Sequence, residues 1–203
     1  MKFFSSRLFL PLIAAMLMLN AGTAFSLDNA EYGENETVSA ESDNDEGLIA
    51  KAKETIRDTW NEGRMEVFVP LYAWHNRKAY PQDKISKYNE YPKGLGIGKY
   101  RYDRKTNRDG LMFIGFSDSN YHFEPLLLYT WQKTWRSKDD FFGFSAGYMA
   151  GFTTRKEWHW VPLPMALPII SFDAGPISYA HTYVPGLGKE NGNVWFSWMS
   201  VRF

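Results

Sequence analysis

The stretch Asn193-Val-Trp-Phe-Ser-Trp-Met-Ser-Val-Arg-Phe203 decides the fold class of this chain. Its aromatic and β-branched residues predict a single β-strand that runs to the final residue. A strand with this ending resembles the C-terminal phenylalanine signal of bacterial outer-membrane barrels. Soluble domains also end in strands, so by itself this ending only suggests an outer-membrane barrel whose last strand is recognised by the barrel assembly machinery.

The first 26 residues predict a signal peptide. Met1–Arg7 is basic, Leu8–Leu19 is apolar, and Ala21–Ser26 supplies small residues for cleavage. The apolar run is shorter than the ~20 residues that a helical membrane span requires. We therefore expect the mature chain to be exported, either as a soluble protein or as a barrel.

Composition narrows the classes of function further. The chain has no cysteine, which excludes disulfides, a cysteine nucleophile and thiolate metal sites. Its net charge of +0 gives no electrostatic reason to expect nucleic acid as a partner. Aromatic residues make up 17% of the chain, a level typical of the girdles of membrane barrels.

Two segments precede the predicted barrel. Leu27–Asp45 is acidic, lacks basic residues and has little apolar content, so we expect it to be disordered. Residues 46–63 place Leu48, Ile49, Ala52, Ile56 and Trp60 at helical spacing, which predicts an amphipathic helix ended by Gly63. This helix could lie at a membrane interface or pack on a neighbouring domain.

From residue 64 to residue 203, strand-length runs alternate with turn-forming sequences. The eight runs are Met65–Trp74, Leu95–Tyr102, Leu111–Phe116, Phe123–Trp135, Phe141–Phe152, Trp158–Phe172, Ile177–Val184 and Val194–Phe203. The fold class is therefore all-β membrane: an eight-stranded antiparallel transmembrane β-barrel with an N-terminal amphipathic helix. Prolines in the sixth run predict unpaired backbone there. An even strand count places loops 1–2, 3–4, 5–6 and 7–8 at the mouth opposite the termini.

Side-chain alternation indicates what the barrel interior contains. In Phe141–Phe152 one face carries large apolar residues, whereas the other carries mainly Gly and Ser. The fourth run places Leu126, Leu128 and Thr130 on its inner face. A narrow, uncharged interior would admit one slender apolar ligand such as an acyl chain. The alternative is that the glycines only allow curvature and close approach of the strands.

A few residues at the predicted mouth could carry chemistry. His75 ends the first strand, and Asp118 and Ser119 lie in the 3–4 loop at the same mouth. Imidazole, hydroxyl and carboxylate suit acyl transfer, although such residues also occur together on loops by chance. The sequence has no H-E-x-x-H or other paired metal-ligand spacing, so we expect neither a metal nor another cofactor.

Several motifs in a fixed order resemble the PagP family of outer-membrane lipid A palmitoyltransferases. They are Pro70-Leu-Tyr-Ala-Trp-His75, Tyr88-Asn-Glu-Tyr-Pro92, Asp118-Ser119 with Glu124-Pro125, Val161-Pro-Leu-Pro164, Tyr183-Val-Pro-Gly186 and Asn191-Gly-Asn-Val-Trp-Phe-Ser-Trp-Met199. The resemblance covers Ile56 to Phe203. It implies an acyltransferase in the outer membrane that moves an acyl chain, palmitate or somewhat shorter, from the sn-1 position of a glycerophospholipid to lipid A.

The resemblance also implies roles for individual residues. His75, Asp118 and Ser119 match the family's catalytic residues, and Trp60 and Arg155 match a clamp between helix and barrel. The prolines that match those flanking the family's lateral lipid entrances are Pro70, Pro92, Pro162, Pro164 and Pro185. Thr130 replaces a glycine at the floor of the acyl pocket, which implies a shorter preferred chain.

Two other functions are compatible with the residues alone. One is a non-catalytic outer-membrane barrel that binds lipids or has a structural role. The other is a soluble lipocalin-like carrier, which the outward-facing aromatic rows disfavour. For the assembly state we expect a monomer or a weak homodimer.

Overall fold

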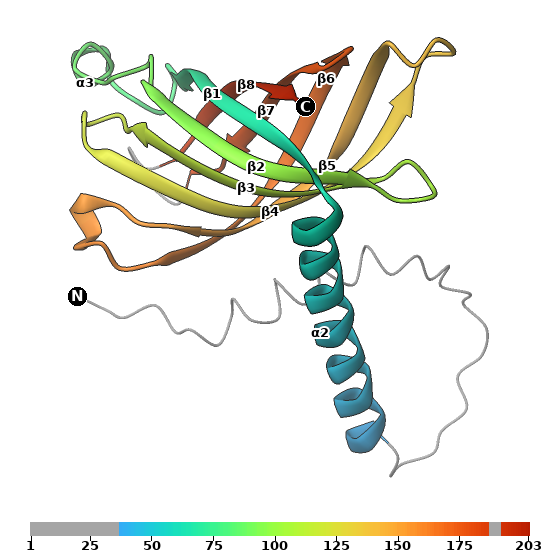
Figure 1. Cartoon of the computed structure of the whole chain (residues 1–203). Coiled ribbons are helices and arrows are strands. Elements are labelled where there is room, and N and C mark those ends of the chain that lie inside the picture. Colours follow the sequence, from blue (N-terminus) through green and yellow to red (C-terminus); the bar gives the residue numbers. More distant parts are fainter. Residues whose placement is uncertain (1–36, 187–191) are drawn as a thin grey trace. The chain divides into compact units, whose positions relative to one another are not determined.

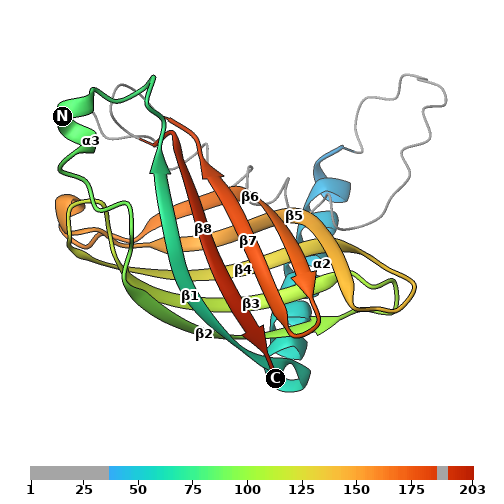
Figure 2. The same cartoon turned by 90° about the horizontal axis from the view of Figure 1, so that it is seen from above.

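The computed structural model describes residues 37–186 and 192–203, which form an antiparallel barrel and one long helix (Figure 1). Each strand pairs with its neighbours in sequence, and β8 closes on β1. Figure 2 shows β1, β8 and β7 side by side in one wall of this barrel. The strands are β1 (Arg64–His75), β2 (Gly94–Tyr102), β3 (Arg108–Ser117), β4 (Phe123–Arg136), β5 (Phe142–Thr153), β6 (Leu163–Ala174), β7 (Ile177–Val184) and β8 (Val194–Arg202). The fold class predicted from the sequence is confirmed.

The sixth strand differs most from its prediction. The first predicted residue, Trp158, ends instead a short 3-10 helix, η2 (Lys156–Trp158), and β6 begins only at Leu163. His159 and Trp160 have positive φ angles of 55° and 62°, which lie outside the β region. The loop therefore turns sharply before Pro162 rather than continuing as a strand.

The long helix, α2 (Thr37–Glu62), begins nine residues before the predicted start at residue 46. Residues 37–45, which we expected to be disordered, are therefore helical, and this corrects the prediction. They contain neither proline nor glycine, so nothing in them interrupts a helix that continues from the amphipathic part. The predicted signal peptide, and the acidic segment up to residue 36, lie outside the described residues.

The chain forms two compact units, Met1–Arg57 and Asp58–Phe203. The last turn of α2 belongs to the barrel unit and is fixed to β2 within it. Lys99 Nζ donates a hydrogen bond of 2.5 Å to the Trp60 carbonyl, and Arg101 lies 3.5 Å from the Asp58 carboxylate.

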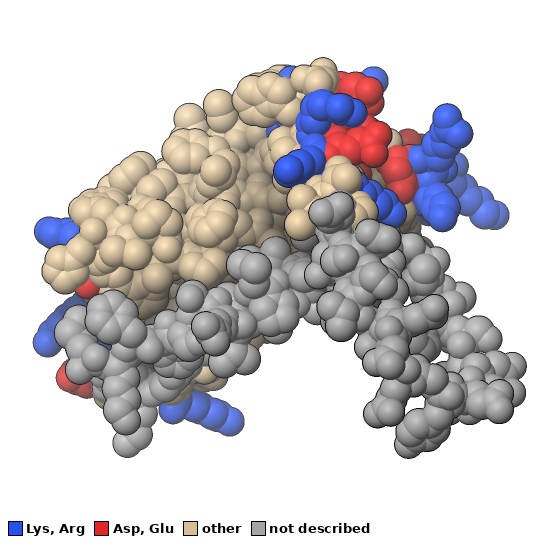
Figure 3. Space-filling view, turned by 90° about the horizontal axis from the view of Figure 1, so that it is seen from below, with Lys and Arg blue, Asp and Glu red and all other residues tan. Residues whose placement is uncertain are grey.

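The predicted alternation is confirmed along the strands. In β4, Leu126, Leu128 and Thr130 are buried inside, whereas Leu127 is 60% exposed on the outer wall. On the barrel surface visible in Figure 3, charged side chains gather at the ends and leave the middle free of charge. Among the described residues, no helix is both long and apolar enough to cross a membrane, a result that does not bear on crossing by strands.

The barrel interior has two zones. The zone toward the outer mouth is apolar; its buried side chains include Phe116, Leu126, Leu128, Leu167 and Phe196. The zone toward the termini contains two buried ion pairs, Glu66–Arg108 and Asp173–Arg202. The prediction of an uncharged interior is therefore wrong for this second zone. Each charged residue comes from a different strand, so no single strand reveals the network by its pattern.

Two ladders of the barrel stop well before the outer mouth. β1 pairs with β2 only over Arg64–Phe68, and β6 pairs with β7 only over Ile169–Ala174. Proline lacks the amide hydrogen that a ladder requires, so proline-rich segments end pairing. Pro70 and Pro92 flank the first gap; Pro162, Pro164 and Pro185 flank the second. The unpaired backbone predicted for the sixth strand is confirmed.

Candidate active site

His75 and Ser119 form a hydrogen-bonded pair at the outer mouth. His75 is the last residue of β1, and Ser119 lies in the turn between β3 and β4. The His75 Nε2 atom is 2.9 Å from Ser119 Oγ, the distance expected between a base and the hydroxyl it activates. The rings of Tyr80 and Tyr88 pack on the imidazole, which is only 2% exposed. The prediction that these two residues share one mouth is confirmed.

The carboxylate that contacts His75 belongs to Glu90, which our sequence reasoning did not single out. Its Oε1 lies 3.2 Å from His75 Nδ1 and accepts a 3.0 Å hydrogen bond from the His75 amide. Arg77 binds both carboxylate oxygens, at 2.5 and 2.6 Å. Burial alone would raise the pKa of Glu90, but the hydrogen bonds from Arg77 and His75 outweigh it and lower that pKa to about 2.

Asp118 is turned toward its own loop. Its Oδ1 accepts hydrogen bonds of 2.8 Å from the backbone amides of Asn120 and His122. Its Oδ2 lies 3.4 Å from Arg155 Nη2. Among the described residues Asp118 has no hydrogen bond with His75, so it does not orient the imidazole by direct contact. An aspartate that begins a tight turn caps the amides of that turn, which is why its side chain points back into the loop.

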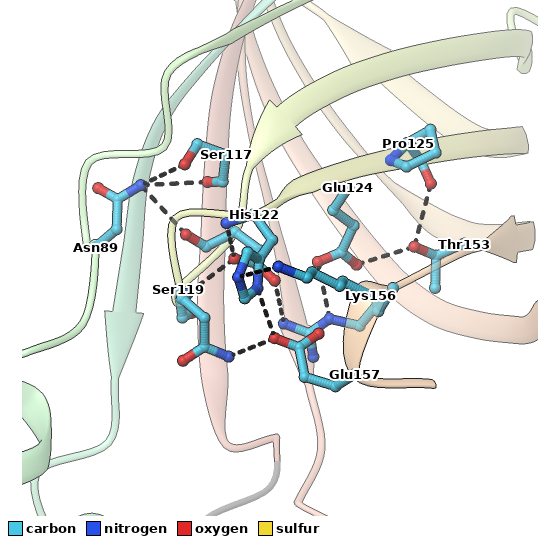
Figure 4. Close-up of polar contacts among 12 residues, drawn as sticks. Asn89, Ser117, Ser119, His122, Glu124, Pro125, Thr153, Lys156 and Glu157 are labelled. Carbon is cyan, nitrogen blue, oxygen red and sulfur yellow. Dashed lines mark hydrogen bonds and ion pairs between the residues drawn. The ribbon is translucent and has the colours of Figure 1, made fainter. Parts of the chain in front are cut away.

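A second polar cluster lies at the mouth, and Figure 4 shows His122, Lys156 and Glu157 in it. Asp118, His122 and Glu157 are the described group whose ligand atoms, all within 4.8 Å of one another, could hold a metal ion. However, Arg155 already lies 3.0 Å from Glu124 and 3.4 Å from Asp118, and Lys156 Nζ lies 3.3 Å from His122 Nε2. These two cations offset most of the negative charge, so the cluster is stable electrostatically without a metal.

Trp60 and Arg155 do not form the expected clamp. Trp60 precedes the start of β1, whereas Arg155 follows the end of β5, so the two residues lie at opposite ends of the barrel. Lys99 contacts the Trp60 ring at 5.4 Å, and Arg155 contacts Asp118 and Glu124. The structure thus corrects the clamp: Lys99 and Arg101 of β2 hold the end of the helix.

Thr130 lies at the boundary between the apolar and the charged zones. It is 6% exposed, points inward as predicted, and lines a cavity of about 20 Å³. Gln132, Met112 and the Glu66–Arg108 pair line the same cavity. Its cross-strand partner is Gly110, where an added Cβ would lie 2.5 Å from Thr130 Oγ1. Thr130 therefore occupies space that Gly110 leaves open.

Comparison with known proteins identifies the family of this chain. Residues 55–200 match the family described as "Antimicrobial peptide resistance and lipid A acylation protein PagP". The "Lipid A acyltransferase PagP" of Cronobacter turicensis is 43% identical over 152 residues, which cover 74% of this chain and 79% of that protein. The protein of the same name from Salmonella typhi is 40% identical over 161 residues, covering 78% of this chain and 84% of the relative. The chain therefore belongs to the PagP family.

Proposed function

We propose that this protein is a lipid A acyltransferase of the bacterial outer membrane. It takes an acyl chain from the sn-1 position of a glycerophospholipid and transfers it to a lipid A hydroxyl. The observation that carries this proposal is the 2.9 Å contact between His75 Nε2 and Ser119 Oγ at the mouth of an apolar interior. Relatives named lipid A acyltransferase support the choice of acceptor.

In this proposal His75 acts as a general base and then as a general acid. Its Nε2 takes the proton of the attacking hydroxyl while that oxygen bonds to the ester carbonyl carbon. The tetrahedral intermediate then breaks its bond to the glycerol oxygen, which receives the proton from Nε2. The apolar zone holds the acyl chain and keeps water away from the carbonyl.

Two routes use the same His75 chemistry. In the first, Ser119 Oγ attacks and the acyl group rests on Ser119. A lipid A hydroxyl then gives its proton to His75 Nε2 and attacks the acyl carbon; the bond to Ser119 Oγ breaks, and Oγ receives that proton. In the second, the lipid A hydroxyl itself attacks, and Ser119 donates a hydrogen bond to the carbonyl oxygen. Trapping of an acylated Ser119, detected by mass spectrometry after rapid quenching, distinguishes them. Asp118 shapes the turn that carries Ser119, because its carboxylate accepts the amides of Asn120 and His122.

The two incomplete ladders are the proposed lateral entrances for lipid. Where β1 and β6 lose their pairing, fewer backbone hydrogen bonds oppose separation of the strands. The interior can therefore exchange an acyl chain with the surrounding leaflet through the side of the barrel.

The other partners in the proposal are the barrel assembly machinery, through the strand ending at Phe203, and at most one further copy of this chain.

The proposal is tested with purified, detergent-folded protein, a radiolabelled phospholipid and lipid A. We expect the wild-type protein to form acylated lipid A. His75→Asn and Ser119→Ala should each lower kcat by a factor on the order of 10²–10⁴, the usual contribution of such groups. Acyl transfer at the wild-type rate by both variants would eliminate the proposed roles. A folded wild-type protein without any transfer would leave a lipid-binding barrel as the better description.

A further inference from the structure

We propose that Glu90 is the residue that positions His75 for catalysis. Its carboxylate accepts the Nδ1–H of the imidazole, so that the lone pair of Nε2 faces the hydroxyl of Ser119. A neutral imidazole carries one proton, and the partner of one ring nitrogen decides which nitrogen keeps it. This inference rests on the proposed acyl transfer and names a residue that this site requires.

The Glu90 carboxylate is held in place from several directions. Arg77 binds it with two parallel hydrogen bonds, a geometry that fixes orientation as well as charge. The Tyr72 hydroxyl donates to Oε2 at 3.2 Å, and the His75 amide donates to Oε1 at 3.0 Å. With these donors in place the carboxylate cannot rotate freely, so the position that it sets for the imidazole is well defined.

The backbone around Glu90 connects the strand that carries His75 with the turn that carries Ser119. The Ala73 amide of β1 donates to the Glu90 carbonyl at 2.9 Å, close to His75 in the same strand. The neighbouring Asn89 amide donates to the Ser119 carbonyl at 2.9 Å, and Asn89 Nδ2 donates to the Asp118 carbonyl at 3.2 Å. Two adjacent residues of one loop thus contact the strand that carries the base and the turn that carries the hydroxyl.

No other carboxylate among the described residues contacts the His75 ring. Asp118 is engaged by the amides of its own turn and by Arg155. The ring also contacts the aromatic rings of Tyr80 and Tyr88 and the hydroxyl of Ser119. Glu90 is therefore the group that can select the Nδ1–H tautomer.

The first test measures steady-state kinetics of acyl transfer by Glu90→Leu and Glu90→Gln. Leucine is similar in size and accepts no hydrogen bond, so we expect a loss in kcat of about 100-fold with KM changed less than about twofold. Glutamine keeps a neutral acceptor and should lose less. The matched control is Asp83→Asn, which removes an exposed carboxylate from α3 (Gln82–Ile85) in the same loop and should keep the wild-type kcat.

A double-mutant cycle with His75 separates positioning from a general effect on the barrel. If Glu90 acts through His75, Glu90→Leu should cause no further loss of kcat in the His75→Asn background. If instead the two losses multiply, Glu90 acts independently of the imidazole and the inference is wrong.

The third test observes the tautomer directly in protein with ¹⁵N-labelled histidine, using the His75→Asn spectrum for assignment. We expect the His75 signals of the wild type to show a protonated Nδ1, and those of Glu90→Leu to show a mixture of tautomers. Identical spectra, or a normal kcat for Glu90→Leu in an active preparation, would overturn the inference. An inactive wild type with the expected tautomer change would overturn the proposed function alone.

Discussion

The two ends of the barrel use the same chemical pair, an arginine and a carboxylate, for different purposes. At the outer mouth, Arg77 binds Glu90, and their side chains are 38% and 13% exposed. Toward the termini, Arg108 binds Glu66, and their side chains are 6% and 2% exposed. The outer pair lies beside a histidine, whereas the inner pair closes the interior.

The difference lies in what else the carboxylate contacts. Glu66 accepts a hydrogen bond of 2.6 Å from Ser200, a neighbour with no acid-base function. Glu90 contacts His75 instead. Among the described residues, the inner zone also leaves buried atoms such as Arg108 Nε and Asp173 Oδ1 without a hydrogen-bond partner. Identical charge pairs can therefore stabilise a fold or orient a reacting group, depending on the third residue.

The largest effect that we expect is on the free energy of unfolding when either arginine is replaced. Arg108→Met leaves the Glu66 carboxylate buried without its cation, which should lower the free energy of unfolding by ~3–5 kcal/mol. The double variant Glu66→Leu with Arg108→Met should recover most of that loss. Arg77→Met, at the more exposed pair, should cost less than Arg108→Met, because water reaches the outer carboxylate more easily. Urea unfolding of the detergent-folded barrel, followed by tryptophan fluorescence, measures all three; equal losses for both arginines would break the comparison.

A smaller effect is expected where the two zones meet. Thr130→Gly removes bulk above the Glu66–Arg108 pair and should let the apolar zone accept a longer acyl chain. We expect selectivity to move toward the longer donor by ~1–3 kcal/mol, or about 10- to 200-fold, the range for one methylene of misfit. Competition between donors of different length, with mass spectrometry of the product, measures the shift. Thr134→Ser, on the same face but bonded to Ser145, is the control and should leave selectivity unchanged.

The smallest effect is a local titration at the outer pair. Because the pKa of Glu90 in the folded protein is about 2, below its ordinary value, the carboxylate stays ionised in mild acid. The stabilisation is therefore complete above the ordinary glutamate pKa, declines as the pH falls below it, and is lost once the pH has fallen through about 2. A ¹³C-carboxyl NMR titration should show an inflection near that value, shifted upward in Arg77→Met. An inflection near 4 in the wild type would contradict the geometry of this pair.

Much of the fold could be predicted because strand sequences carry local signals. Alternation places Leu127 outside and Thr130 inside without knowledge of any neighbour. The candidate site was predictable only in part. Strand parity brings His75 to the mouth that also holds Ser119, but it does not tell which carboxylate meets the imidazole. Glu90 lies in the quoted motif Tyr88-Asn-Glu-Tyr-Pro92, yet a single acid in a long loop has no periodicity to interpret.

The sequence by itself therefore determined the number and direction of the strands, the apolar outer wall, the breaks in pairing at the prolines and the mouth at which His75 and Ser119 lie. Only the tertiary structure decided that Glu90 contacts His75 and that Asp118 caps its own turn. It also decided that Lys99 rather than Arg155 contacts Trp60, and that ion pairs occupy one zone of the interior. The physical reason is the separation along the chain between the residues that interact. Strands and turns follow from neighbours along the chain, whereas each of these contacts joins side chains from separate segments that closure of the barrel and packing of its loops bring together.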